Sequence, residues 1–151
     1  MRPNLTARGV DIPSLTCLFC ESDFEDIGYV MVKCLKVSVV WRKVWSWWNL
    51  PPPTSFPSFS SIDVAKGNFP DRGCPSIEKV MNGDFQISLW AIWSWKNRII
   101  HATGTDIESA KNEDIFPRIQ RIAKLWISAR ICSKLKTDWV CWIAMPWELF
   151  S

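Results

Sequence analysis

The sequence predicts a mainly α-helical protein, in which a small cysteine-containing helical module is followed by a Pro/Ser-rich linker and two longer amphipathic helices. Apolar residues recur at helical steps of three and four in three stretches. Proline and serine concentrate between the first and the second of these stretches. The chain has 151 residues, 48% of them hydrophobic, which is enough to bury a core. We therefore divide it into a module at 1–50, a linker at 51–83 and a C-terminal helical region at 84–151.

The module begins with "NLTARGVDIPS", which reads as the tail of a short helix closed by Gly9, followed by an extended approach to the first cysteine pair. The next stretch is rich in valine, yet its apolar residues form one helical stripe: Val37, Val40, Trp41, Val44 and Trp48. The segment "NLPPP" ends this helix. Trp45 and Trp47 lie away from the centre of the stripe, so we expect their rings to be exposed.

The first helix of the C-terminal region is expected to be capped by Asp84 and to stop near Gly104. His101, the only histidine, then stands near the helix end, where a cation is favoured. The predicted apolar stripe consists of Phe85, Leu89, Ile92, Trp93, Ile99 and Ile100. Trp93 is accordingly expected in the core.

A final helix is predicted at 113–135, with Pro117 in its first turn, where a missing N–H costs nothing. Its apolar stripe contains Ile115, Ile119, Ile122 and Trp126. The tail "DWVCWIAMPWELF" is too aromatic for a solvated segment, so we expect it to pack back onto the helices.

The cysteines contain one pattern that is typical of a metal site. Cys17 and Cys20 are separated by two residues, so a tight turn can point both sulfurs at one ion, and Cys34 follows. A tetrahedral zinc site needs a fourth ligand, and the spacing does not supply an obvious one. Two alternatives remain open: a metal site, or three buried thiols. The other cysteines, Cys74, Cys132 and Cys141, show no ligand spacing and are interpreted as buried or incidental.

Several kinds of chemistry are not indicated by the sequence. The single tyrosine rules out the Tyr-x-Asp-Asp turn that holds polymerase metal ions, and the carboxylates are scattered rather than grouped. No phosphate-binding glycine loop or GxSxG motif occurs, and one histidine leaves little room for acid–base triads. We therefore expect a non-catalytic protein without a small-molecule substrate.

The sequence also constrains the compartment. It shows no secretory signal and no apolar run of the ~18–20 residues that cross a bilayer. We therefore expect no membrane partner and an intracellular location, nuclear or cytoplasmic, where the cysteines remain thiols or ligands. Nothing in the sequence indicates an oligomeric state.

The motif order from residue 4 to residue 48 resembles the reverse-transcriptase zinc-binding domain of plant LINE-type (non-LTR) retrotransposon polyproteins. That family combines an Asn-Leu-x-x-Arg-Gly block, a Cys-Pro-x-Cys turn, a Glu-(Ser/Thr) pair, a His-Leu-Phe-Phe-x-Cys block and a Val-Trp pair. The matching segments here are "NLTARGV", "CLFC", Glu25-Asp26, "YVMVKC" and Val40-Trp41. Residues 84–147 match more loosely, through "LWAIWSWKNRIIH" and "RIQRIAKLWISAR".

The resemblance implies zinc as cofactor, with ligands at Cys17, Cys20, Tyr29 and Cys34. Tyr29 stands where the family has histidine, and a phenol with a pKa of about 10 binds zinc less well than imidazole. The site is then either a weaker zinc site or an ordinary core. The resemblance also implies truncation at the N-terminus, and a parent polyprotein that acts as an RNA-directed DNA polymerase.

Basic residues supply the candidate nucleic-acid contacts. The net charge of +3 is too small to indicate RNA or DNA by itself, but the surplus lies at 111–151, with seven basic and four acidic residues. The candidates are Lys33, Lys36, Arg42, Lys43, Arg118, Arg121 and Lys124; solvated helix faces are the alternative interpretation. The leading hypothesis is a non-catalytic, nucleic-acid-binding accessory domain. The alternative is a decayed, metal-free fragment that acts as a helical interaction domain.

Overall fold

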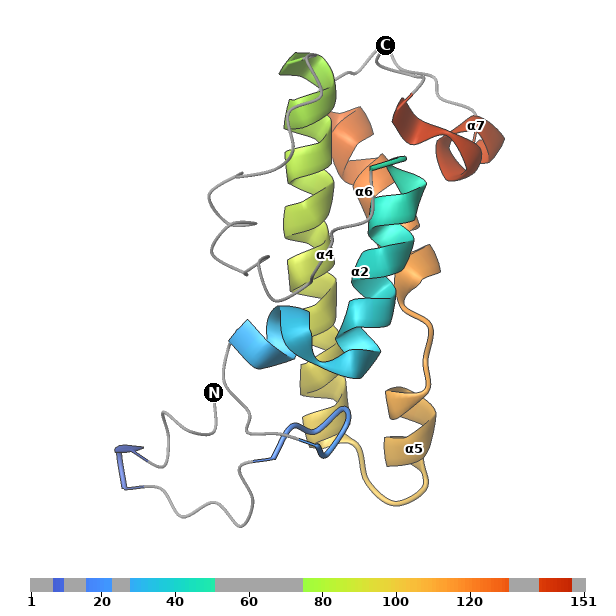
Figure 1. Ribbon diagram of the computed structural model, residues 1–151. Helices are drawn as coiled ribbons and strands as arrows, with labels where there is room; N and C mark the ends of the chain where they lie inside the picture. Colours follow the sequence, from blue (N-terminus) through green and yellow to red (C-terminus); the bar gives the residue numbers. More distant parts are fainter. Residues whose placement is uncertain (1–6, 10–15, 23–27, 51–74, 131–138, 148–151) are drawn as a thin grey trace.

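A computed structural model of the chain describes residues 7–9, 16–22, 28–50, 75–130 and 139–147 (Figure 1). Within these ranges every regular element is a helix, which confirms the predicted fold class. The elements are the π-helix η1 (Tyr29–Lys33) and the α-helices α2 (Leu35–Trp47), α4 (Pro75–His101), α5 (Asp106–Lys111), α6 (Phe116–Arg130) and α7 (Trp139–Ala144). None of the described helices combines the length and the apolar character needed to span a bilayer.

The long helix α4 forms the axis of the molecule, and α2 and α6 pack along it (Figure 1). The loop with the first cysteine pair lies near the C-terminal end of α4, together with α5. The short helix α7 lies toward the other end, beside α2 and α6. One hydrophobic core runs from Cys17 to Trp142 and joins all of these helices except the solvent-exposed α5, whose Ala110 only borders it.

The packing of α2 corrects one prediction. Trp41 is fully buried, as its place on the stripe predicts, but Trp45 and Trp47 are only 5% and 6% exposed. The ring of Trp45 stacks on Phe85 with centroids 5.4 Å apart, and Trp47 meets the ring of Trp142 edge-on at 5.1 Å. Helix α2 is therefore covered on more than one side, by α4 and by the α6–α7 end, and a single stripe does not describe its buried surface.

Helix α4 begins at Pro75 rather than Asp84, so the last part of the predicted linker is helical, while residues 51–74 lie outside the described part. Asp84 does not cap the helix but is fully buried within it. Proline suits the first turn, because the amides there have no intrahelical partner. The helix ends at His101, as predicted.

The buried face of α4 is displaced by one residue from the predicted stripe in its C-terminal half. The core-facing residues follow steps of three and four: Phe85, Ser88, Ile92, Trp95 and Ile99. Trp93 and Ile100 each stand one position beyond this face and are 49% and 45% exposed, which corrects their assignment to the core. The apolar pattern did not include Ser88, because serine is polar. In the structure Ser88 is buried, and its hydroxyl donates a hydrogen bond to the Asp84 carbonyl.

The last helices differ from prediction mainly at their boundaries. Helix α6 begins at Phe116 rather than at 113, because Asp114 accepts a 3.1 Å hydrogen bond from the Phe116 amide and so terminates the preceding turn. Pro117 lies in the first turn, as predicted. The predicted residues 131–135 lie outside the described part. Helix α5 was not expected, since none of its residues is buried and it leaves no apolar stripe.

Buried tryptophans connect the elements through their indole N–H groups. Each donor finds an oxygen on a different element: Trp41 on Met31, Trp47 on Trp142 and Ile143, Trp48 on Asp84, Trp95 on Ala110 and Trp142 on Gln120, all at 2.6–3.1 Å. The indole ring thus fills the core and also satisfies a buried polar atom. The tail is held in the same way, because Trp142 of α7 is 1% exposed, so the prediction that it packs back is confirmed.

Candidate metal centre

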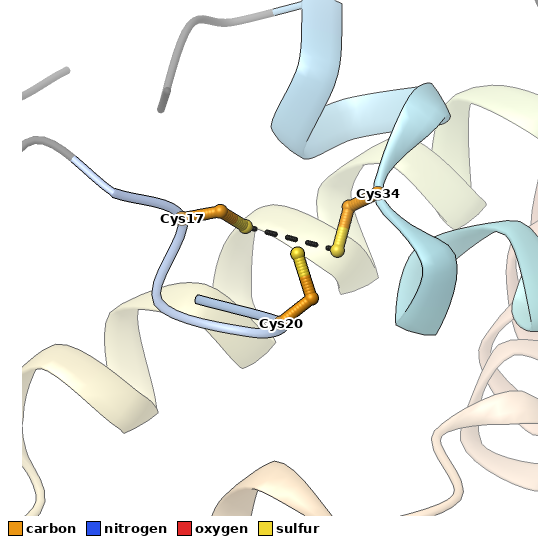
Figure 2. Close-up of side chains that lie close together, drawn as sticks. All are labelled: Cys17, Cys20 and Cys34. Atoms are coloured by element: carbon orange, nitrogen blue, oxygen red, sulfur yellow. Dashed lines mark hydrogen bonds between the residues drawn. The ribbon is translucent and has the colours of Figure 1, made fainter. Parts of the chain in front are cut away.

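Three cysteine side chains converge at one point between the N-terminal loop and α2 (Figure 2). The sulfur atoms of Cys17, Cys20 and Cys34 all lie within 4.8 Å of one another. The sulfurs of Cys17 and Cys34 are 3.7 Å apart and share a hydrogen bond. Cys17 and Cys34 are fully buried, whereas Cys20 is partly accessible. The fold therefore brings the thiols of Cys17 and Cys20 together with the thiol of Cys34, which is farther along the chain, in one cluster.

The distance between the sulfurs of Cys17 and Cys34 fits two ligands of a tetrahedral metal ion. Zinc binds thiolate sulfur at about 2.3 Å, and the tetrahedral angle then separates two sulfur ligands by roughly 3.8 Å. The 3.7 Å between Cys17 and Cys34 agrees with this value. Three thiolates are a soft donor set, the kind that selects zinc or a related soft ion over magnesium or calcium.

The turn from Cys17 to Glu21 places the first two thiols. The Glu21 amide donates a 2.8 Å hydrogen bond to the Cys17 carbonyl, and Glu21 has a φ of +57°. A left-handed conformation is unfavourable for a residue with a Cβ and is found more often at functional sites. The backbone amides of Phe19 and Cys20 face the sulfur of Cys17 and favour its thiolate form.

Cys34 occupies the junction between η1 and α2. It is the N-cap residue of α2, with an extended backbone (φ −56°, ψ 135°), and its carbonyl accepts the first helical hydrogen bond from Ser38. The amides of Val37 and Lys36 point toward its sulfur. A helix N-terminus stabilises negative charge, so this position suits a thiolate ligand. The π-helical turn that precedes it is a conformation that recurs at functional sites.

The two buried thiols share their proton unequally. The hydrogen bond between the two thiols, together with hydrogen bonds from backbone amides, lowers the pKa of Cys17 to about 6 despite its burial. The same thiol–thiol hydrogen bond and burial raise the pKa of Cys34. A bound divalent cation would favour thiolates at both positions, since its charge replaces the shared proton.

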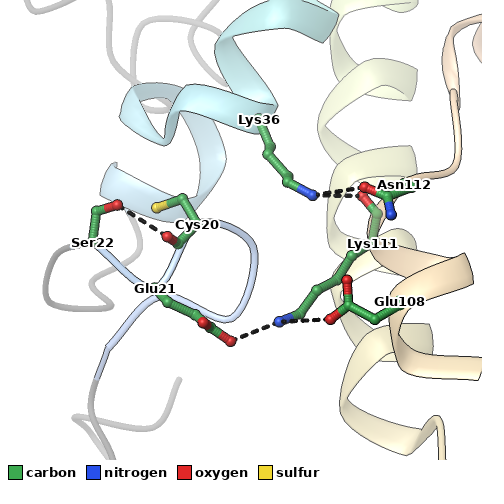
Figure 3. A network of polar contacts seen from close by, with 7 residues as sticks. All are labelled: Cys20, Glu21, Ser22, Lys36, Glu108, Lys111 and Asn112. Atoms are coloured by element: carbon green, nitrogen blue, oxygen red, sulfur yellow. Dashed lines mark hydrogen bonds and ion pairs between the residues drawn. The ribbon is translucent and has the colours of Figure 1, made fainter. Parts of the chain in front are cut away.

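A polar network attaches the cysteine loop to α5 (Figure 3). Lys111 forms a 2.8 Å ion pair with Glu21, next to Cys20, and the hydrogen bond and charge of Lys111 lower the pKa of Glu21. Lys36 of α2 donates to the Lys111 carbonyl at 3.3 Å and to the Asn112 side chain at 3.2 Å. Phe19, inside the turn, packs on Trp95 of α4, with the two ring centroids 4.5 Å apart. The loop is therefore supported by elements from the C-terminal half.

The predicted fourth ligand position is the first residue of η1. Tyr29 begins this element, five residues before Cys34, but its side chain lies outside the described part of the structure. Of the other cysteines, Cys141 is exposed on α7, whereas Cys74 and Cys132 also lie outside the described residues. His101 is exposed at the end of α4.

The predicted basic residues fall in separate places. Lys33 is exposed at the end of η1, and Lys36 is engaged with the end of α5. Arg42 and Lys43 line a groove of about 680 Å³ between α2, α6 and α7, where Lys43 forms a 2.7 Å ion pair with Asp114. The remaining three, Arg118, Arg121 and Lys124, lie together on α6.

Two tryptophans beside the α6 cations were missed by sequence reasoning. The guanidinium carbon of Arg118 lies 5.9 Å from the ring centroid of Trp90, and the ammonium of Lys124 lies 5.1 Å from that of Trp139. Both rings come from other helices, so no local pattern could reveal these pairs. One signal in the sequence was available for Trp90: it lies outside the apolar stripe of its helix, which indicates an exposed ring.

A scan against protein-family models and searches of curated proteins and of solved structures found no match to this chain.

Proposed function

We propose that this chain is a non-catalytic, zinc-binding accessory domain that binds nucleic acid, related to the zinc-binding domain of retrotransposon reverse transcriptases. The convergence of Cys17, Cys20 and Cys34 is the observation that carries the proposal. Cys20 and Cys34, with 13 residues between them, do not meet without a fold that brings them together. The distance between the sulfurs of Cys17 and Cys34 and the amides that face them suit a thiolate-bound ion.

In the proposed site the three cysteines hold the ion, and the fourth position is filled by Tyr29 or by water. The metal would fix the loop at 17–22 against the start of α2, a structural role that contributes directly to folding. The protein would act by binding rather than by chemistry, because its sequence lacks the clustered carboxylates of a polymerase. In a longer parent protein, such a domain would hold RNA or DNA for the neighbouring polymerase.

Metal content tests the first part of the proposal. We expect about one zinc per chain in protein purified without chelator, with Cys34→Ser reducing the zinc content and lowering stability. The exposed thiol of Cys141 provides a matched control, and Cys141→Ser should retain the wild-type zinc content. Equal zinc content in the two variants would show that the metal is bound elsewhere.

The substitution Tyr29→His tests the assignment of the fourth ligand. Imidazole is neutral at pH 7 and is a better zinc ligand than a phenol, so the variant should bind zinc more tightly by roughly tenfold or more. Competition with a chromophoric chelator measures this affinity. An unchanged affinity would mean that position 29 does not reach the ion, and the three-cysteine site would then be completed by water.

The second part of the proposal is that the protein binds RNA or DNA. The salt dependence of the binding affinity tests it. Phosphate contacts release counterions, so the affinity should fall steeply as salt rises. Filter binding at several salt concentrations, with single-stranded and double-stranded probes, gives this slope. A protein that binds neither probe at low salt would refute the nucleic-acid role while leaving the metal site untouched.

A second candidate is a metal-free helical interaction domain, and one observation favours it. Cys17 and Cys34 are both fully buried and belong to the continuous apolar core, where free cysteine is common. In that case the purified protein would contain no zinc, and added chelator would leave its unfolding unchanged.

A further inference from the structure

The surface around α6 combines cations and aromatic rings from three helices. Arg118, Arg121 and Lys124 lie on α6, and none of them forms an ion pair within the described ranges. Trp90 of α4 stands beside Arg118, and Trp139 of α7 stands beside Lys124. We refer to these five residues as the α6 surface. Other basic residues are already engaged: Lys43 by Asp114, Lys111 by Glu21 and Arg98 by Glu113.

The two rings of the α6 surface are, together with Trp93, the large exposed aromatic rings of the described residues. Trp90 and Trp139 are 47% and 41% exposed, whereas Trp41, Trp48 and Trp142 are at most 1% exposed. Leaving so much of a large ring in water forgoes hydrophobic stabilisation. An exposed ring next to a cation is an arrangement that ligands with a flat apolar group and a negative charge can use.

A recess lies within this surface. It has a volume of about 510 Å³ and is lined by Arg118, Arg121 and Trp139, with Pro117, Glu113 and Asp114 completing its wall. This volume lies within the range of small-ligand pockets, so it can take a nucleotide-sized group. The two carboxylates are each neutralised, since Glu113 pairs with Arg98 and Asp114 pairs with Lys43, both at 2.7 Å. A surplus of positive charge therefore faces an incoming anion.

We propose that the α6 surface binds single-stranded nucleic acid, with phosphates on Arg118, Arg121 and Lys124 and with bases stacked on Trp90 and Trp139. This inference rests on the proposed function and gives it a location away from the metal centre. Stacking requires unpaired bases, because in a duplex the base faces are covered by their neighbours. A flat anionic membrane would not enter the recess, so the shape of the surface favours a flexible strand.

Fluorescence anisotropy with a labelled oligothymidine of about 15 nucleotides tests this proposal on the full chain. We expect Arg118→Ala/Arg121→Ala to weaken binding and to reduce the salt slope by about two, one for each lost phosphate contact. Trp139→Ala and Trp90→Ala should each weaken binding by about tenfold. If the double variant folds poorly, Arg121→Ala alone replaces it, because Arg121 is exposed. This single variant should reduce the salt slope by about one.

The controls are an exposed cation and an exposed apolar residue outside the α6 surface. Lys79→Ala on α4 and Leu35→Ala on α2 should bind the oligonucleotide as the wild type does. If the wild type binds with a steep salt slope and all α6-surface variants behave like the controls, this surface is wrong although the proposed function stands. A wild type that binds neither a single-stranded nor a duplex oligonucleotide at low salt refutes this surface and the nucleic-acid part of the proposed function. Binding only to a duplex refutes the single-strand assignment and leaves the proposed function standing, whereas binding only to anionic phosphatidylserine vesicles refutes both.

Discussion

At the residue scale, Asp84 is a buried carboxyl group with one oxygen hydrogen-bonded and the other without a partner among the described residues. It is completely buried in α4, its Oδ2 accepts a 2.6 Å hydrogen bond from Trp48, and its Oδ1 has no partner among the described residues. Desolvation raises the pKa of Asp84 to about 7 from its ordinary value of 3.8, against the opposing effect of the Trp48 hydrogen bond. The folded protein therefore binds this proton more tightly than the unfolded chain.

The pH dependence of stability follows from that difference. The contribution of Asp84 is fully present below its unfolded pKa of 3.8 and is lost as the pH rises through the folded value of about 7. Asp84→Asn keeps an acceptor for Trp48 and removes the charge, so it should raise the free energy of unfolding above pH 7 by about 1–3 kcal/mol. Urea unfolding between pH 4 and 8 measures the effect. Parallel pH profiles for wild type and variant would contradict it.

Asp114 provides a control of opposite sign. Although desolvation opposes ionisation, hydrogen bonds from Lys43 and from the Phe116 amide, with the charge of Lys43, lower its pKa. Its contribution to stability is present above its unfolded pKa and is lost as the pH falls through the lowered folded value. Asp114→Asn should therefore reduce stability at neutral pH and make no difference in strong acid.

Trp47 tests the role of the indole donors. Its N–H donates to the carbonyls of Trp142 and Ile143 at 3.1 and 3.0 Å, which holds α7 against α2. Trp47→Phe keeps an aromatic ring but leaves those carbonyls without this donor, so the free energy of unfolding should fall by roughly 2 kcal/mol. Trp93→Phe, on a half-exposed ring, should change it by less than about 0.5 kcal/mol. Equal effects in guanidinium unfolding would contradict this account.

At the element scale, one contact between α4 and α6 depends on the absence of a side chain. A Cβ added at Gly83 would lie 2.5 Å from Cζ3 of Trp126. Alanine normally favours a helix over glycine by about 1 kcal/mol, but overpacking here should cost about 1–3 kcal/mol. We expect Gly83→Ala to lower the melting temperature and Gly83→Ala/Trp126→Leu to recover part of the loss. A stabilised Gly83→Ala would show that the ring moves aside freely.

Two elements were predictable from local sequence signals. The stripe of α2 identified its helix, and Pro117 marked the start of α6. The beginning of α4 was not recognised, because its first turns adjoin a stretch rich in turn-forming residues and glycine interrupts them. Trp45 and Trp47 were misplaced because α2 is covered from several sides, which depends on tertiary packing that a single helical wheel does not contain.

At the scale of the whole molecule, the cysteine cluster and the C-terminal helices form one structure. The loop at 17–22 is held by Trp95 of α4 and by Lys111 of α5, which are far from it in sequence. The three cysteines could be chosen as candidate ligands from the sequence, since Cys-x-x-Cys is a local signal and Cys34 follows it. Their distances, their amide contacts and the pairing of basic residues with rings on other helices depend on the fold and could not be read from the chain.

The most direct test of the central claim is X-ray absorption at the zinc edge of the purified full-length chain. The account predicts three sulfur ligands at about 2.3 Å and one oxygen or nitrogen ligand, with Cys34→Ser reducing the sulfur count to about two or abolishing zinc binding. Protein that retains no zinc, or zinc surrounded by oxygen and nitrogen only, would contradict the assignment of Cys17, Cys20 and Cys34 as a metal centre.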